Sequence, residues 1–189
     1  MTITLNGNGS VTGLTALPRA AMSTGSVVQV VSTVMNDNLY WADQQDWTDI
    51  TGLAATITPT ASSNKILIYT QVMVANAESN NGDYTCALAL KRGGSLLSYD
   101  SSGAKGYGDY HKYIAADDAE GNLRSDTGHF MKLDAPNTTS ATTYQIVIKP
   151  GSSTWTGNDI YINRTNRSDN DWFNSQEVNS SITLMEVVA

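Results

Sequence analysis

The stretch that decides the fold is Gly52-Leu-Ala-Ala-Thr-Ile-Thr-Pro-Thr-Ala-Ser-Ser-Asn-Lys-Ile-Leu-Ile-Tyr69. It joins two β-branched runs through a connection of Thr, Pro, Ser and Asn, residue types that favour turns. The ending Ser181-Ile-Thr-Leu-Met-Glu-Val-Val-Ala189 has the same strand character. Nothing between them has the periodicity of an amphipathic helix. The sequence therefore predicts a chain built almost wholly of strands and turns.

Three runs give the clearest strand predictions. Residues 26–34 are apolar on both faces, which predicts a buried central strand, and so are residues 65–75, the longest β-rich run. Residues 84–91 and 95–99 flank Arg92-Gly-Gly94, which predicts a β-hairpin. Because the strands are closely spaced and show no repeat period, they predict an all-β fold, an antiparallel β-sandwich of jelly-roll type. Further strands are expected at 47–53, 55–58, 110–114, 128–133, 142–149, 159–163 and 182–188.

The first 25 residues differ from the rest of the chain. Two short strand-like pieces, 2–5 and 10–14, are separated by Asn6-Gly-Asn-Gly9, a strong turn signal. Residues 17–25 read as a linker or a single helical turn. Such an arm is too small to bury a core of its own, so we expect it to dock on another copy or another protein, or else to remain a tail. We therefore divide the chain into an N-terminal anchoring arm, 1–25, and a β-sandwich domain, 26–189.

Charge and composition exclude several classes of function. The chain has 189 residues and a net charge of −7, with 11 basic residues against 18 acidic ones, so it repels phosphate backbones and predicts no nucleic-acid partner. The N-terminus lacks the basic and apolar regions of a signal peptide, and no run reaches transmembrane length, so we expect synthesis in a cytoplasm and no membrane insertion. Cys86, the single cysteine, lies in an apolar strand pattern and is expected to be a buried, inert thiol.

Several phrases in one order resemble the C-terminal module of tail-fibre-like virion proteins of tailed bacteriophages. The arm resembles the segment that often precedes this module. The phrases are Gly25-Ser-Val-Val-Gln-Val-Val-Ser-Thr33, Trp47-Thr-Asp-Ile-Thr-Gly-Leu53, Ile57-Thr-Pro-Thr-Ala-Ser-Ser-Asn-Lys-Ile-Leu-Ile68, Ala135-Pro-Asn-Thr-Thr-Ser-Ala-Thr-Thr-Tyr144, Ile160-Tyr-Ile-Asn-Arg-Thr165 and Ser181-Ile-Thr-Leu-Met-Glu-Val187. The resemblance implies a β-rich homotrimer on a virion, made in the host cytoplasm, and it transfers no catalytic residues.

Three functions remain open at this stage. The first is a non-enzymatic, trimeric adhesin that is attached to other virion proteins through residues 1–25 and contacts a host glycan or receptor. The second is a decoration protein on the phage head, with the arm lying along the shell. The third, more remote, is a carbohydrate-active enzyme on the same scaffold.

The predicted contact residues for a host surface are aromatic and polar residues in two loop-like segments. Trp155 lies in a Ser/Thr/Gly-rich stretch, and Trp172 and Phe173 follow Asn170 and Asp171 in a long polar one. An exposed indole beside hydrogen-bonding groups complements the C–H face and the hydroxyls of a sugar ring, which predicts glycan contact. The alternative is that these aromatics are buried under their loops or across a subunit interface.

The remaining chemistry-bearing residues give weaker signals. Asp117–Asn122 and Asp169–Asp171 carry carboxylates suited to Ca²⁺, yet neither matches a known calcium loop, so solvated acidic loops are expected and no metal is predicted. His111 and His129 are the only histidines, and no nucleophile elbow accompanies them, so no catalytic residue and no cofactor is predicted.

Overall fold

A computed structural model describes residues 4–5, 7, 11–12, 22–41, 46–77, 84–97, 108–114, 125–150, 159–165 and 178–189. Within these ranges every regular element is a β-strand. The strands are β1 (Thr4–Leu5), β2 (Val11–Thr12), β3 (Val27–Met35), β4 (Leu39–Trp41), β5 (Thr48–Ile57), β6 (Lys65–Ala77), β7 (Tyr84–Arg92), β8 (Ser95–Leu96), β9 (Tyr110–Ile114), β10 (Ser125–Asp134), β11 (Thr142–Pro150), β12 (Asp159–Ile162) and β13 (Ser180–Val187).

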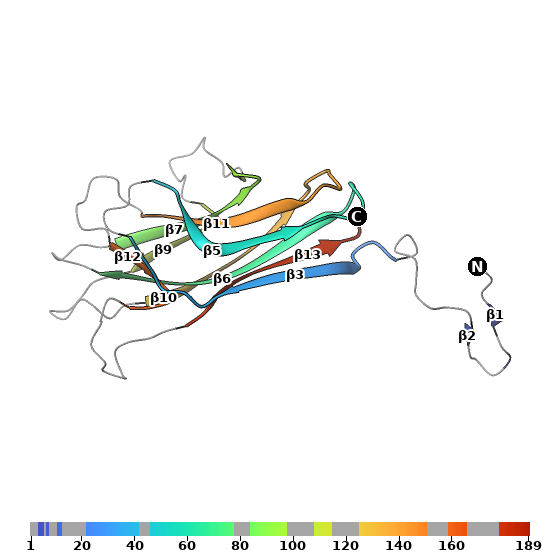
Figure 1. Cartoon of the computed structure of the whole chain (residues 1–189), viewed down its shortest axis with the longest axis horizontal. Helices are drawn as coiled ribbons and strands as arrows, with labels where there is room; N and C mark the ends of the chain where they lie inside the picture. Colours follow the sequence, from blue (N-terminus) through green and yellow to red (C-terminus); the bar gives the residue numbers. More distant parts are fainter. Residues whose placement is uncertain are drawn as a thin grey trace.

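Two antiparallel sheets lie face to face (Figure 1). The first contains β3, β13, β6 and β10 in that order, and β12 and β4 extend it beyond the ends of β13 and β3. The second contains β5, β11, β7 and β9 in that order, with the short β8 beside the end of β7.

This strand order is that of a jelly roll. The eight main strands in chain order are β3, β5, β6, β7, β9, β10, β11 and β13. The first sheet therefore holds the first, eighth, third and sixth of them, and the second holds the second, seventh, fourth and fifth. The predicted antiparallel, jelly-roll-like sandwich is confirmed.

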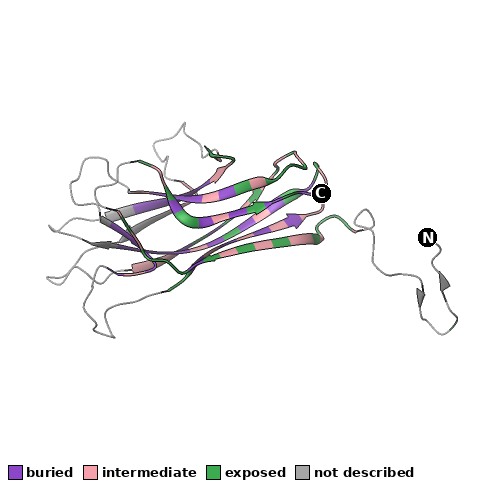
Figure 2. Cartoon of the chain, in the orientation of Figure 1, coloured by how far each residue is buried: buried purple, intermediate pink, exposed green. Residues whose placement is uncertain are grey.

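The core lies between the two sheets and is almost purely aliphatic. Ile66 and Ile68 of β6 face Leu88 of β7 and Ile146 of β11 across it, and all four are fully buried. Figure 2 shows buried residues along the strands of both sheets. Each fully buried side chain of this size contributes about 1.5–3 kcal/mol, so the core needs neither a metal nor a disulfide to hold.

Two of the sequence predictions are confirmed in detail. β6 is the central strand of its sheet, because it pairs with β10 on one side and with β13 and β12 on the other. The hairpin of β7 and β8 turns through Gly93 and Gly94, whose φ angles of 55° and 86° fit the two-glycine turn that hairpins favour. The two strand-like pieces of the arm form β1 and β2, which pair as a short antiparallel ladder.

The prediction for residues 26–34 is wrong in one respect. They form β3, but β3 lies at the edge of its sheet and is not a buried central strand. Val30 and Val34 point outward and are 58% and 57% exposed, while the intervening Val31 packs against the core. A run that is apolar on both faces indicates that both faces of the strand are shielded from water. It does not show that residues of the same chain shield both faces.

One local feature was not predicted, and another was left open between a linker and a helical turn. Leu39–Trp41 forms the short strand β4, which pairs with β12 and was not expected. Residues 22–26 form a bend and a turn where a helical turn was one of two expectations. Residues 17–21 lie outside the described ranges.

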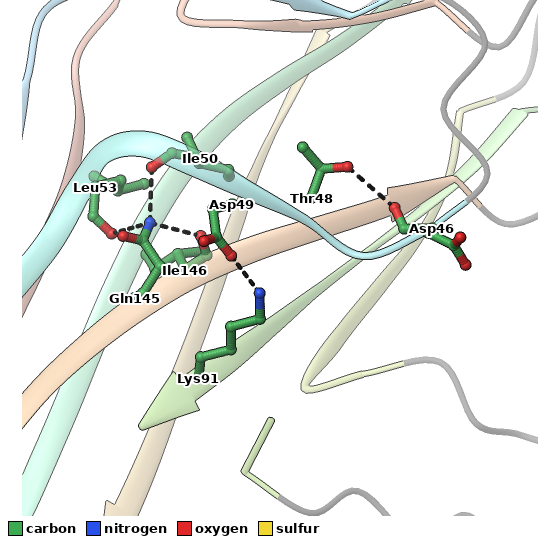
Figure 3. A network of polar contacts seen from close by, with 8 residues as sticks. All are labelled: Asp46, Thr48, Asp49, Ile50, Leu53, Lys91, Gln145 and Ile146. Atoms are coloured by element: carbon green, nitrogen blue, oxygen red, sulfur yellow. Dashed lines mark hydrogen bonds and ion pairs between the residues drawn. The ribbon is translucent and has the colours of Figure 1, made fainter. Parts of the chain in front are cut away.

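β5 carries an extended bulge that a single side chain supports. Gln145 of β11 faces Ala54, and Val147 faces Asp49, so residues 50–53 stand opposite one residue of β11. Figure 3 shows Gln145 Nε2 donating to the carbonyl oxygens of Ile50, Leu53 and Ile146 at 2.8, 3.2 and 3.0 Å. The bulge lets both Ile50 and Leu53 point into the core, where they are fully buried.

The beginning and the end of the sandwich meet at one end of the molecule. Gly25 N donates to Val188 O at 2.8 Å, and Val188 N donates to Ser26 O at 3.0 Å. Thr24 Oγ1 adds a bond to Ala189 O at 3.3 Å. Since residues 1–21 lead into this pairing, we call this the arm end of the sandwich.

Candidate interaction surfaces

The end of the sandwich opposite the arm end, here called the loop end, receives the segments with the predicted contact residues. Asp159 pairs with Ala77, the last residue of β6, and Pro150 pairs with Cys86 near the start of β7. Both flanks of segment 151–158 therefore lie at the loop end. Segment 166–177 follows Thr165, and β13 begins shortly after it at Ser180, opposite Met35, the last residue of β3.

Every predicted contact residue lies outside the described residues. Trp155 falls in segment 151–158, and Asn170, Asp171, Trp172 and Phe173 fall in segment 166–177. The structure thus brings the strand ends that carry the two segments to one end of the molecule, and contact by these five side chains stays a prediction.

A buried asparagine, which sequence reasoning missed, joins the strand ends at the base of segment 166–177. Asn163 has a positive φ of 63° and is fully buried. Its Nδ2 donates to Met35 O at 2.8 Å and Asp37 O at 3.0 Å, and its Oδ1 accepts from Ser180 Oγ at 2.6 Å. Val178 N donates to Asn163 O at 3.2 Å, so both ends of the segment are fixed together. The sequence signal is an Asn that follows a buried strand, since Asn tolerates this left-handed backbone.

An aromatic pair and an arginine stand on the same sheet near the loop end. The rings of Tyr40 and Tyr161 lie 4.9 Å apart at 32°, and the guanidinium of Arg164 is 5.0 Å from the Tyr161 ring centre. Tyr161 is buried, whereas Tyr40 is 48% exposed. Tyr40 therefore presents an aromatic surface next to β12, the strand that connects the two segments predicted to contact a host.

The outer face of the first sheet is the second candidate surface, and apolar side chains predominate on it. Val30, Met185, Leu67 and Leu133 stand side by side across β3, β13, β6 and β10. Leu133 is 55% exposed and Met131, in the next row, is 69% exposed. Figure 2 shows exposed and intermediate residues following each other along β3. We call this surface the apolar face; its residues are Val27, Val30, Val34, Leu67, Tyr69, Met131, Leu133, Met185 and Val187.

His129 lies at the margin of the apolar face. Its Nδ1 is 3.4 Å from the hydroxyl of Tyr69, and the two rings are stacked at 6.3 Å. These contacts place His129 beside a phenol and an apolar surface. The side chain of His111 lies outside what the structure describes.

Carboxylates of β10 and of the β9 entry join the two sheets along one edge. Asp134 accepts two bonds from Arg92 Nη1, at 2.9 and 2.8 Å, and one from Tyr144 Oη at 2.6 Å. Asp126 accepts from Tyr110 Oη at 3.1 Å, and Lys132 donates to Asp109 at 2.6 Å. These contacts are structural, because they connect strands of one sheet to strands of the other.

Both phenols in this edge are held neutral. Burial, followed by the hydrogen bond to Asp134, raises the pKa of Tyr144 well above its ordinary value. Burial and the hydrogen bond to Asp126 raise the pKa of Tyr110 in the same way. Each phenol therefore remains a hydrogen-bond donor at any pH near neutrality.

Glu186 anchors the turn that decides the fold, and sequence reasoning missed it. Its side chain is fully buried and points inward from β13. Oε1 accepts from Thr60 N, Thr60 Oγ1 and Asn64 Nδ2 at 2.6, 2.7 and 2.7 Å. The available signal was an acidic residue in an apolar strand together with Thr and Asn in a distant turn. A cavity of about 330 Å³ opens beside this turn at the arm end, lined by Met22, Val28 and the last two residues among others.

The other predictions about chemistry have mixed outcomes. Cys86 is buried, with 1% of the residue exposed, so the predicted buried thiol is confirmed. Within the described ranges no group of three or more His, Cys, Asp or Glu residues is placed to hold a metal ion. Asp117–Asn122 and Asp169–Asp171 lie outside those ranges. The part of the chain that the structure describes also contains no helix long and apolar enough to span a membrane.

Comparison with known proteins gives distant structural neighbours and no sequence relative. No protein-family model matches the chain, and no curated protein matches it. Structures that resemble it include infectious bursal disease virus, Gx strain (TM-score 0.39, 12% identity, 92% of this chain and 46% of that one), and its VP2 subviral particle (0.37, 13%, 93% and 46%). Another is the dimeric latent PorU of Porphyromonas gingivalis (0.33, 9%, 88% and 14%).

The two infectious bursal disease virus neighbours are virion capsid proteins, and this chain spans less than half of their length. At such TM-scores the likeness carries no argument about what this protein does.

Proposed function

We propose that this protein is a non-enzymatic structural component of a virus particle, a tail-fibre-like adhesin of a tailed bacteriophage present as a homotrimer. The observation that carries the proposal is the difference between the two ends of the sandwich. Residues 22–26 and 188–189 are paired at the arm end, and the strand ends that carry segments 151–158 and 166–177 are at the loop end. An adhesin needs this separation of its attachment site from its contact site.

Three other observations support the proposal. The jelly roll is a scaffold shared by viral capsid and lectin domains, although the fold alone does not define the function. The sequence phrases quoted above resemble the phage module in one order. The aliphatic core and bonded strand ends give a rigid base, on which weak contacts repeated in several copies become strong through avidity.

In this proposal residues 1–25 attach the protein to other virion proteins, and the loop end meets a glycan or another receptor on the host cell. Tyr40 adds an exposed aromatic ring to the five predicted contact residues. Sugar binding by aromatic rings fits this composition, since the rings supply a flat apolar face with polar groups beside it.

A host-binding assay tests the contact site. Trp155→Ala and Trp172→Ala are expected to reduce binding of the purified protein to host cells by tenfold or more, on the order of 1.4 kcal/mol. Thr139→Ala is the matched control, because Thr139 is exposed in the connection after β10 at the arm end. Full binding by both Trp variants would contradict the proposed contact site.

The second candidate is a decoration protein on the phage head. The observation that favours it is the apolar face, which follows the side of the sandwich and suits a molecule lying flat on a shell. Labelling with antibody and electron microscopy separate the two candidates, because a fibre is found at the tail and a decoration protein is found across the head. Absence of the protein from purified particles would contradict both.

A further inference from the structure

We propose that the apolar face, together with the free edge of β3, is the surface on which copies of this chain pack against one another. This inference rests on the proposed function, because the apolar face would supply the contacts between the copies of the homotrimer. The partner that covers this surface is a second copy of this chain.

The first argument is the arrangement of the side chains. The row Val30, Met185, Leu67 and Leu133 crosses all four main strands of the sheet without interruption. In the next row, Tyr69 and Met131 are neighbours, and Ser32 and Thr183 bond to each other at 2.9 Å. Their polar groups are therefore satisfied within the face. Contiguous exposed apolar surface of this kind marks an interaction site, whereas scattered apolar residues do not.

The second argument is area. Four strands about 4.8 Å apart, over seven residues at about 3.3 Å each, cover on the order of 450 Å² of flat sheet. Protruding side chains make the accessible area larger than this. A standard interface takes roughly 800 Å² from each partner, so the flat face alone supplies more than half of the area that contact with one copy requires, and the side chains and the adjoining β3 edge add to it.

The third argument is charge. The chain carries a net charge of −7, so most of its surface repels another copy. The outward positions of β3, β13, β6 and β10 from Val27 to Val34 and their partners hold no Asp or Glu, and Lys65 and His129 stand at the margins. An uncharged apolar surface has no charge to repel another copy, so identical chains can pack there around a threefold axis.

The fourth argument is the edge of β3. No described strand pairs with its outer side, although it is nine residues long and β-branched. Proteins that leave such an edge in water protect it with Pro, Lys, a short length or a bulge, and β3 has only an irregularity near Val27, at its first residues. The edge is continuous with the apolar face, so one partner can cover both.

The test is the oligomeric state of the purified full-length protein by sedimentation velocity over a wide range of concentration. The wild type is expected to form oligomers. The double variant Val30→Glu/Leu133→Glu is expected to associate at least a hundredfold more weakly, about tenfold for each carboxylate forced against an apolar surface. Both residues are more than half exposed, so folding is expected to survive, and circular dichroism checks this.

The matched control is Thr56→Glu/Ser95→Glu, which adds the same charge at exposed positions of the other sheet. It is expected to associate like the wild type. Equal association of the two double variants would overturn the proposal, because the effect would then be one of total charge or of another surface.

Other occupants give different results. A wild type that is monomeric at every concentration overturns the proposal, and it does so whether residues 1–21 of the same chain or another virion protein covers the face. Incorporation of each variant into particles then distinguishes these two occupants, because loss of incorporation of the Val30→Glu/Leu133→Glu variant alone is expected only if another virion protein covers the face. Conversely, oligomers that require the apolar face but are absent from virions would support this inference and contradict the proposed function.

Discussion

The outer face of β10, β6, β13 and β3 and the outer face of β5, β11 and β7 belong to one sandwich, yet their outward side chains differ in character. On the first, Val30, Leu133 and Met131 are exposed in adjoining rows. On the second, Thr56 and Thr143 bond to each other at 2.7 Å, and Lys91 pairs with Asp49 at 2.5 Å (Figure 3). The inward faces of the two sheets, by contrast, are equally aliphatic.

This difference shows where the fold constrains the sequence and where it does not. Inward positions must fill the core, so they are alike in both sheets. Outward positions are free of that demand, and their composition reports what each face meets. We infer that one face meets protein and the other meets water.

The largest loss of stability is expected for a substitution on the inward side of the first sheet, compared with one on its outward side. Ile68→Ala removes a fully buried side chain of β6 and is expected to cost about 2–5 kcal/mol of unfolding free energy. Leu133→Ala, on the outward side of the neighbouring strand, is expected to cost less than about 1 kcal/mol in the monomer. Urea unfolding followed by circular dichroism measures both. Equal losses would mean that the outward side is also packed within one chain.

A smaller effect is expected for Glu186, the acidic residue on the inward side of β13. Glu186→Ala leaves Thr60 N and Asn64 Nδ2 without their acceptor, at a cost of about 1–3 kcal/mol. Glu186→Gln keeps one acceptor oxygen and is expected to lose less. Ser181→Ala, on the outward side of the same strand, is the control. If all three variants unfolded at the wild-type urea concentration, the anchoring role of Glu186 would be refuted.

The hydrogen bonds at the edge that joins the two sheets predict that the stability of the fold decreases at alkaline pH. The pKa values of Tyr110 and Tyr144 are raised above 10.0, so the folded state keeps protons that the unfolded chain releases. Their contribution is complete below pH 10 and is lost as the pH rises above it. Tyr110→Phe/Tyr144→Phe is expected to lose about 1 kcal/mol per hydrogen bond at neutral pH and to decline less steeply above pH 10. Urea unfolding on both sides of pH 10 measures the slopes, and parallel slopes would contradict the assignment.

The smallest effect is expected on the polar outer face. Lys91→Met removes the ion pair with Asp49, whose side chain is 55% exposed. Exposed pairs contribute about 0–1 kcal/mol and are screened by salt, so a small loss that shrinks at high salt is expected. Unfolding at low and high salt checks this. A loss comparable to that of Ile68→Ala would show that this face is also part of a packed interface.

Several elements could be predicted from sequence because their signals are local. The Arg92-Gly-Gly94 turn requires positive φ angles that glycine supplies, and the hairpin formed as expected. The strand predicted at 65–75 from its length and its apolar faces is β6, which the structure extends to Ala77. β3 has the same pattern and yet lies at the edge, because strand order depends on contacts between distant segments.

The candidate site was predictable only in outline. Aromatic residues within polar, loop-like segments pointed to Trp155 and Trp172, whose contact with a host stays a prediction. Pairing of distant strands brings the ends of their segments together. Asn163 and Glu186 escaped prediction because each acts on residues far away in the chain: Glu186 bonds to Thr60 across 126 positions, and Asn163 to Met35 across 128.

The sequence by itself determined that this chain is all-β, acidic and without a disulfide, because strand propensity, charge and cysteine count are properties of the residues alone. Only the tertiary structure decided that β6 is central and β3 is an edge, and that nine apolar residues share one outward face. The physical reason is that sheet order and register are set by hydrogen bonds between segments distant in sequence, and a side chain acquires its neighbours only when those bonds form.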